Sequence, residues 1–213
     1  MKKALSLISG GIDSPVASYL MIKQGLEVVF IHFHNETVSK SAVENKVVKI
    51  VKVLSKEQKK TKLYLIPFKE LQFEIIKQIP ARARMLVYRR VMFMIADKIA
   101  EKEDCEAFIT GDSLGQVASQ TIENLNVIYE AAKLSVLTPL IGENKEATIK
   151  LAQKIGTFEI SKLPYEDCCS FLIAKHPETK AKINLIKNFE ENLELKQLIE
   201  KTTSLAKVLD IRC

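Results

Sequence analysis

A glycine pair follows the first apolar run of the chain after a single serine. Residues 4–8 are typical of a buried strand, and the next six residues are Ser9-Gly10-Gly11-Ile12-Asp13-Ser14. A helical pattern then covers residues 13–24 and ends at Gly25. A glycine-rich turn between a strand and a helix brings backbone N–H groups to a helix N-terminus, where anions bind. The sequence therefore predicts a phosphate-binding loop at residues 9–14.

The residue types in this loop indicate a nucleotide triphosphate. Gly10 and Gly11 can adopt the required dihedrals and let an anion approach the main chain, and Ser14 can donate its hydroxyl. Asp13 alone would repel phosphate, so it indicates a Mg²⁺ ion or a pyrophosphate handled through a metal. The alternative is a plain strand–turn–helix connection with a Ser or Asp N-cap. The spacing matches neither G-x-x-x-x-G-K-[ST] nor G-x-G-x-x-G.

Apolar runs alternate with helical patterns along the rest of the chain. We expect further strands at 27–33, 63–67, 107–110 and 136–137, and helices at 39–55, 85–102, 116–132 and 145–155. This alternation predicts an α/β fold with a doubly wound, mostly parallel sheet. Ligands bind such sheets at the carboxyl strand ends where the strand order reverses, so the turns near Gly10 and Gly111 are the expected site walls.

The last part of the chain predicts amphipathic helices. From about residue 178 the pattern is charged, with an apolar stripe. We therefore expect one domain at 1–177 and a C-terminal helical extension of it at 178–213.

The composition permits an anionic partner without requiring one. The chain has 32 basic and 26 acidic residues, a net charge of +6. This charge suits ATP or RNA, and equally an ordinary lysine-rich surface. No apolar run approaches the roughly 18 residues that span a bilayer, and the early first strand leaves no room for a signal peptide. A soluble, cytoplasmic protein without a membrane partner is expected.

Several segments, taken in order, resemble one enzyme family. The loop resembles S-G-G-x-D-S, the PP-loop of the N-type ATP pyrophosphatases, whose fold is adenine nucleotide alpha hydrolase-like. Residues 110–121, T-G-D-S-L-G-Q-V-A-S-Q-T, resemble the second signature of the tRNA 4-thiouridine synthetases, also known as thiamine-biosynthesis sulfurtransferases. Further matches lie at 139–141, 144–146, 155–157, 164–169 and 175–180. The resemblance extends from residue 3 to about residue 182.

The resemblance implies an ATP-dependent tRNA sulfurtransferase. The family adenylates the 4-carbonyl oxygen of a tRNA uridine and releases pyrophosphate, and a cysteine persulfide then delivers sulfur and displaces AMP. By this match Asp13 is the loop aspartate that binds metal or pyrophosphate, Lys145 is the catalytic lysine and Cys168 handles sulfur. ATP and Mg²⁺ are the implied cofactors. The implied partners are tRNA, a sulfur donor such as a cysteine desulfurase or sulfide, and a second copy in a homodimer.

Other candidate residues flank the predicted strand ends. In the superfamily that this chain resembles, the backbone after the second strand meets adenine, which implicates His32 and Phe33 by position; the His32 imidazole could act as a general base or pack at the strand end. Asp112 is a candidate second Mg²⁺ ligand, or a cap for the next helix. Together with the loop, the candidate nucleotide-binding residues are Ser9, Gly10, Gly11, Ile12, Ser14, His32, Phe33, Gly111 and Gln116.

The four cysteines raise a question of reactivity, since no C-x-x-C spacing suggests zinc. A sulfur carrier must be a thiolate, and Cys168 has basic residues close in sequence: Lys162, Lys175 and His176. The alternative for Cys168 is a buried structural thiol. Cys169 is a candidate resolving partner, Cys213 could relay sulfur from a terminus, and Cys105 is expected to be structural.

A basic cluster leaves two interpretations open. It consists of Arg82, Arg84, Arg89 and Arg90 with Tyr88. These side chains could meet RNA phosphate or ATP, or they could form the solvated flank of a buried helix.

Three functions therefore compete. The family's N-terminal ferredoxin-like and THUMP region has no counterpart before the loop at residue 9, which favours either a separate RNA-binding chain or a smaller acceptor. The first function is a tRNA-uridine thiolating enzyme. The second is a sulfurtransferase for a small molecule or a sulfur-carrier protein, as in thiamine thiazole synthesis. The third is a non-catalytic nucleotide-binding subunit, against which the presence of Asp13, Lys145 and Cys168 together argues.

Overall fold

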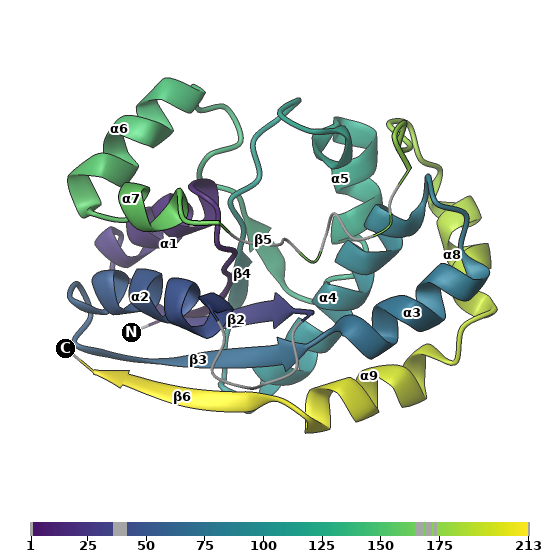
Figure 1. Ribbon diagram of the computed structural model, residues 1–213, viewed down its shortest axis with the longest axis horizontal. Coiled ribbons are helices and arrows are strands. Elements are labelled where there is room, and N and C mark those ends of the chain that lie inside the picture. Colours follow the sequence, from purple (N-terminus) through teal and green to yellow (C-terminus); the bar gives the residue numbers. More distant parts are fainter. Residues whose placement is uncertain (1, 36–41, 165–167, 169–171, 173, 213) are drawn as a thin grey trace.

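A six-stranded sheet forms the centre of the computed structural model, which describes residues 2–35, 42–164, 168, 172 and 174–212 (Figure 1). The strand order is β5-β4-β1-β2-β3-β6. The strands are β1 (Lys3–Leu7), β2 (Glu27–His34), β3 (Lys60–Pro67), β4 (Ala107–Ile109), β5 (Ser135–Leu137) and β6 (Lys207–Arg212). The first five are parallel, and β6 runs antiparallel to β3. The predicted α/β fold with a mostly parallel sheet is confirmed.

Helices cover both faces of this sheet (Figure 1). One layer contains α1 (Asp13–Lys23), α2 (Ala42–Ser55), α6 (Lys145–Ile155) and α7 (Phe158–Ser161). The other contains α3 (Lys69–Gln78), α4 (Arg84–Lys102), α5 (Ile122–Tyr129), α8 (Ile183–Glu191) and α9 (Leu195–Ser204). In the described part of the chain, no helix is both long and apolar enough to cross a membrane.

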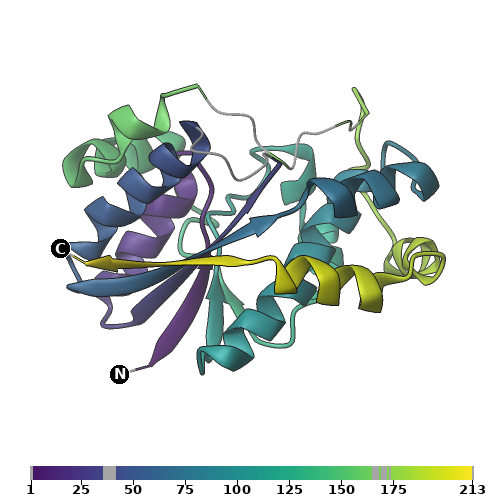
Figure 2. The same ribbon diagram turned by 60° about the horizontal axis from the view of Figure 1, so that its bottom comes forward.

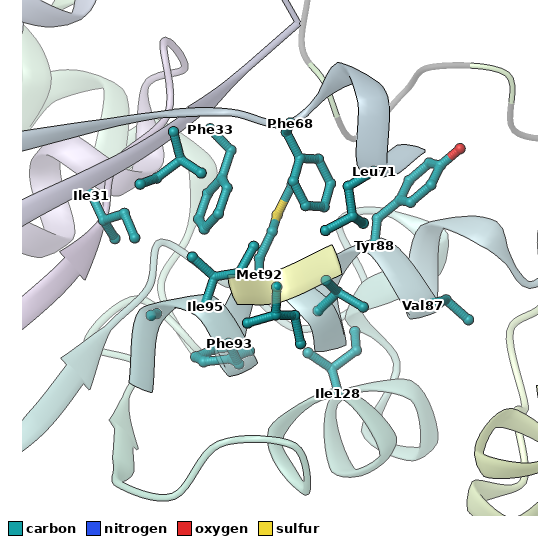
Figure 3. Packing of buried hydrophobic residues seen from close by; sticks show 14 of the residues in the cluster. Ile31, Phe33, Phe68, Leu71, Val87, Tyr88, Met92, Phe93, Ile95 and Ile128 are labelled. Atoms are coloured by element: carbon teal, nitrogen blue, oxygen red, sulfur yellow. The ribbon is translucent and has the colours of Figure 1, made fainter. Parts of the chain in front are cut away.

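Each helix layer packs its own apolar core against the sheet. The core beneath α1, α2 and α6 includes Val16, Phe30 and Val51. The core on the α4 side combines aliphatic and aromatic side chains: the rings of Phe33 and Phe68 meet edge to face, with centroids 5.3 Å apart (Figure 3). Full burial of such a side chain stabilises the fold by roughly 1.5–3 kcal/mol. Buried apolar residues recur along the whole length of α4, and this pattern made the helix recognisable in the sequence. The predicted helix at 85–102 matches α4 closely.

The structure corrects the expected helix at 116–132. A 3₁₀ turn, η1 (Ala118–Gln120), and then α5 replace it. Gly115 has a left-handed φ of 72°, and Thr121 is extended and caps α5 by accepting from the Asn124 N–H at 3.2 Å. Residues 116–117 therefore belong to a loop.

The tail differs from the helices expected after residue 178. It forms α8 and α9, and it then ends in β6, which follows α9 along the sheet edge (Figure 2). The helix α3 was also not predicted. In β6 only Ile211 is buried, so the strand lacks the apolar alternation by which strands are recognised in sequence.

Two arginines of the basic cluster bind other parts of the protein. Arg90 is buried and pairs with Glu190 of α8 at 2.6 Å and with Glu130 at 3.0 Å. Arg84 donates to the backbone carbonyls of Ile79, at 2.9 Å, and Leu172, at 2.8 Å. These two side chains therefore hold elements of the fold together. Neither of the two interpretations of the basic cluster, a solvated helix flank or a contact to RNA or ATP, applies to them.

Candidate active site

The site lies where the chain changes direction across the sheet. From β1 the chain builds β2 and β3 on one side, and β4 and β5 then pair on the other. The turns after β1 and β4 are therefore neighbours. At Gly111 a Cβ atom would lie 2.4 Å from the backbone nitrogen of Ser14 and 2.7 Å from the carbonyl carbon of Asp13. Only glycine allows this approach, so the two predicted walls do meet.

Serine side chains shape the loop at residues 9–14. The Ser14 hydroxyl accepts from the Ser9 N–H at 2.8 Å and lies 3.0 Å from the Ser9 hydroxyl. The Ser9 hydroxyl in turn accepts from the Gly11 N–H at 3.2 Å. The N-cap of α1 is Ile12, which provides no side-chain cap, so the plain capping alternative is not what the structure shows.

The two loop glycines do not adopt the left-handed backbone conformation. The left-handed glycines of the described residues are Gly25, Gly115 and Gly156, and neither Gly10 nor Gly11 is among them. A Cβ atom at Gly11 would lie 3.3 Å from the Ser9 hydroxyl oxygen, so the missing side chain leaves room for the bond from the Gly11 N–H to that oxygen.

Asp13 lies at the centre of a small polar cluster. Its carboxylate accepts from the Lys145 ammonium at 2.7 and 2.9 Å and from the Gln116 amide at 3.1 Å. Lys145 is the first residue of α6, which Asn144 caps by accepting from the Glu146 N–H at 2.9 Å. Three separated segments thus deliver a cation, an amide and a carboxylate to the mouth of the loop.

Asp112 lies deeper and is fully engaged by protein donors. It accepts from Arg89 at 2.6 Å, from the Tyr129 hydroxyl at 2.6 Å and from Gln120 at 3.0 Å. Burial opposes its ionisation, but the charge of Arg89 and the three hydrogen bonds outweigh burial and lower its pKa to about 2. Burial and the Asp112 charge raise the pKa of Tyr129. Asp112 therefore holds Arg89 in place as a carboxylate.

These donors decide where a Mg²⁺ ion would fit. Mg²⁺ prefers one or two carboxylates together with phosphate oxygens and water. The half-exposed pair of Asp13 and Lys145 can rearrange to admit a cation beside phosphates. A metal at Asp112 would have to displace its arginine or its tyrosine, so the donor set does not fit a metal there. Within the described residues, no three His, Cys, Asp or Glu side chains form a metal-binding group.

One cavity of about 550 Å³ has both Asp13 and Asp112 in its wall, whereas Lys145 is not among its lining residues. Its wall at the loop includes Ser9, Gly11, Asp13 and Ser14. Other lining residues are His32, Phe33, Arg89, Gly111, Asp112, Gln120 and Cys168. Among the predicted nucleotide-binding residues, Gly10, Ile12 and Gln116 stand next to the cavity without being part of its lining.

His32 is a neutral, buried imidazole at the end of β2. Its Nδ1 lies 2.8 Å from the Ile8 carbonyl oxygen, which can only accept, so Nδ1 carries the proton. Burial and the neighbouring His34 lower the pKa of His32 to about 4, although the bond to Ile8 opposes that shift. The imidazole fixes the end of β1 to the end of β2.

Protonation of His32 should make stability depend on pH. The unfolded chain binds this proton below about pH 6.5 and the folded chain only below about pH 4. The unfolded state therefore binds more protons between these values, and the free energy of unfolding should fall by roughly 3 kcal/mol as pH drops through this window. Urea unfolding from pH 7 to pH 4 measures the slope. His32→Gln keeps an N–H donor without titrating and should flatten it; an equal slope in both proteins would contradict the assignment.

Cys168 lines the cavity and is 4% exposed. Its backbone carbonyl accepts from the buried Gln72 amide at 2.6 Å. Of the basic residues expected near it, Lys162 pairs with Glu159 at 3.2 Å. Cys169 and Cys213 lie outside the described residues, as do residues 165–167. At Cys105 burial raises the pKa to about 12, which agrees with a structural thiol.

Sequence reasoning missed several residues that shape the site. Gln120 lines the cavity four residues beyond Gln116, and only the loop conformation reveals this. Ser161 donates its hydroxyl to the Gly11 carbonyl at 3.0 Å, and Lys46 donates to the Ser161 carbonyl at 2.9 Å. These contacts join residues more than a hundred positions apart, so no local sequence pattern signals them.

Most of the chain is similar in sequence to known proteins. The family model described as thiamine biosynthesis protein (ThiI) matches residues 1–195. A probable tRNA sulfurtransferase of Caldanaerobacter subterraneus subsp. tengcongensis is 46% identical over 198 residues, which are 93% of this chain and 52% of that protein. One of Thermus thermophilus is 44% identical over 197 residues, 92% of this chain and 48% of that protein. The chain spans about half the length of these relatives.

Solved structures show the same architecture. A 4-thiouridine synthetase in complex with RNA and bound ATP superposes with a TM-score of 0.93 at 37% identity, over 99% of this chain and 55% of that chain. The NMN synthetase of Francisella tularensis superposes with a TM-score of 0.57 at 14% identity, over 95% of this chain and 84% of its own. The second likeness concerns the fold alone.

Proposed function

Because the chain belongs to the ThiI family, we propose that it adenylates a uridine carbonyl of tRNA with ATP, releases pyrophosphate and transfers sulfur from Cys168 to form 4-thiouridine. The observation that carries this proposal is the shared cavity, in which the phosphate-binding loop and Cys168 line one space. A nucleotide-binding module would need no thiol beside its phosphate site. An adenylating sulfurtransferase needs both within reach of one carbonyl carbon.

The loop at residues 9–14 would hold the pyrophosphate end of ATP. Its backbone N–H groups and the N-terminus of α1 supply partial positive charge without a conformational change. Lys145 supplies a full cation, which would move from Asp13 onto the phosphoryl oxygens as charge develops there. A Mg²⁺ ion held by Asp13 and phosphate oxygens would add charge neutralisation when bound.

The inner wall would hold the adenosine and the α-phosphate. The backbone at His32 and Phe33, together with Gly111, would border the nucleoside. Arg89 is held rigidly by Asp112, so its guanidinium is preorganised for an anion in the cavity. The uridine oxygen attacks the α-phosphorus in this position, and pyrophosphate leaves.

Sulfur transfer would start at Cys168. A persulfide on Cys168, formed by a cysteine desulfurase or from sulfide and an oxidant, attacks the activated carbon with its outer sulfur, and AMP leaves. A second thiol then breaks the S–S bond, which leaves the sulfur on uridine and a disulfide on the protein. Cys169 and Cys213 are the candidates for this second thiol, and a homodimer or a separate RNA-binding chain would help to hold the tRNA.

Pyrophosphate release with and without tRNA tests the proposal. With ATP, a sulfur donor and unmodified tRNA, we expect release that depends on tRNA, and 4-thiouridine in the digested nucleosides by mass spectrometry. Pyrophosphate release that does not depend on tRNA but requires a small molecule or a carrier protein would identify a different acceptor. No release with any acceptor would leave a nucleotide-binding subunit.

A further inference from the structure

The described part of the segment from Cys168 to Glu178 contacts α3, the start of α4 and the turn between them. Among its described residues, Leu172 accepts from Arg84, the Ala174 N–H donates to the Ala81 carbonyl at 3.3 Å, and the Glu178 N–H donates to the Arg82 carbonyl at 3.0 Å. At Cys168 the corresponding contact is the hydrogen bond from Gln72. Of these four contacts, the hydrogen bond from Gln72 is the one made to the cysteine residue itself.

Gln72 is an unusual residue for its surroundings. It is 0% exposed on the inner face of α3, where Leu71 and Ile75 are also buried. Its Nε2 donates to the Cys168 carbonyl at 2.6 Å, while its Oε1 is buried and has no hydrogen-bond partner among the described residues. The orientation of the amide is fixed by its partner, because a flipped amide would turn its oxygen toward the carbonyl oxygen.

A buried acceptor without a partner costs free energy, and native proteins keep few of them. A leucine at position 72 would remove that cost and would suit the apolar face of α3. Packing therefore does not explain the glutamine, whereas the short bond to Cys168 does. We infer that Gln72 is a positioning residue that fixes the main chain at Cys168 and thereby holds the thiol against the cavity wall.

This inference builds on the proposed function, in which Cys168 attacks the adenylated carbon. A misplacement of about 1 Å at a reacting atom can lower a rate by about a hundredfold. The phosphate-binding loop is held by other contacts, from the Ser9 and Ser14 hydroxyls and from Ser161. Loss of the Gln72 bond should therefore impair sulfur transfer and spare adenylation.

Alkylation of Cys168 in the folded, full chain tests the positioning without requiring activity. Iodoacetamide labelling is followed by peptide mass spectrometry, with the buried Cys105 as the internal reference. Gln72→Leu removes the donor and should label Cys168 about tenfold faster, because the main chain there opens more often. The control Leu71→Val trims the neighbouring buried side chain, disturbs packing only and should label like the wild type.

The partial reactions supply the second measurement. In Gln72→Leu we expect sulfur transfer to fall about 10- to 100-fold, while pyrophosphate release stays within about twofold. Unchanged labelling and unchanged transfer would overturn the inference, and so would an equal loss of both reactions. If Gln72→Leu does not fold, Gln72→Met provides the same comparison with a flexible side chain. A wild-type chain that releases no pyrophosphate would refute the proposed function alone, since the labelling comparison would still decide the role of Gln72.

Discussion

Replacing Cys168 by serine should abolish sulfur transfer and leave ATP-dependent pyrophosphate release in place. Serine has nearly the same shape, so the cavity wall and the Gln72 contact to the main chain survive. A hydroxyl cannot carry a sulfane sulfur, and it is a far weaker nucleophile than a thiolate. We expect transfer to fall by at least about a thousandfold, since the variant loses the covalent carrier itself.

The measurement is transfer of radiolabelled sulfur from a persulfide donor into the acceptor, run beside a pyrophosphate assay on the same preparation. Cys105→Ser is the matched control. That thiol is buried, and its raised pKa keeps it protonated, so its replacement should leave both reactions near the wild-type rate. Undiminished transfer by Cys168→Ser would show that another residue carries the sulfur.

Gly111→Ala should disable nucleotide binding. The new methyl group would lie 2.4 Å from the backbone nitrogen of Ser14, and its nearest neighbours are all main-chain atoms of the loop at residues 9–14. Since no flexible side chain can move aside, either the loop or the turn after β4 must shift. Both structures line the cavity, so we expect the affinity for ATP to fall by about a hundredfold or more.

Calorimetric titration with ATP measures this change. Gly142→Ala is the control, because a Cβ atom there would have no neighbour within 4 Å, and it should bind ATP as the wild type does. A Gly111→Ala variant that is folded and binds ATP normally would show that the two turns separate easily, contrary to the packing described above.

The central strands and the loop could be predicted because local chemistry determines them. Buried parallel strands appear as apolar runs, and a glycine pair followed by an aspartate at a strand-to-helix turn has few other uses. The turns after the first and fourth strands were expected as site walls because ligands bind such sheets where the strand order reverses, and the structure places these two turns in contact. The roles of Asp13, Lys145 and Cys168 rest on the family resemblance and stay proposals, to be tested by mutation.

The roles of individual side chains could not be predicted from the sequence where they depend on long-range contacts. Arg84, Arg89 and Arg90 lie within seven residues, yet one holds backbone carbonyls, one pairs with a cavity aspartate and one is buried with Glu190. Composition and hydrophobic periodicity do not distinguish these three arginines from one another. Gln116 and Gln120 likewise differ only through the fold of their loop, which places Gln116 on Asp13 and Gln120 on Asp112.

The antiparallel strand β6 has a consequence for how the chain is made. β3 is complete at residue 67, but one of its edges has no partner until residues 207–212 have left the ribosome. Until then this edge of β3, a strand rich in apolar side chains, exposes unpaired N–H and C=O groups. Such an edge can pair with a strand of another nascent chain. Pairing with β6 covers the apolar edge of β3 and leaves as the free edge of the sheet a strand that carries the charged residues Lys207, Asp210 and Arg212.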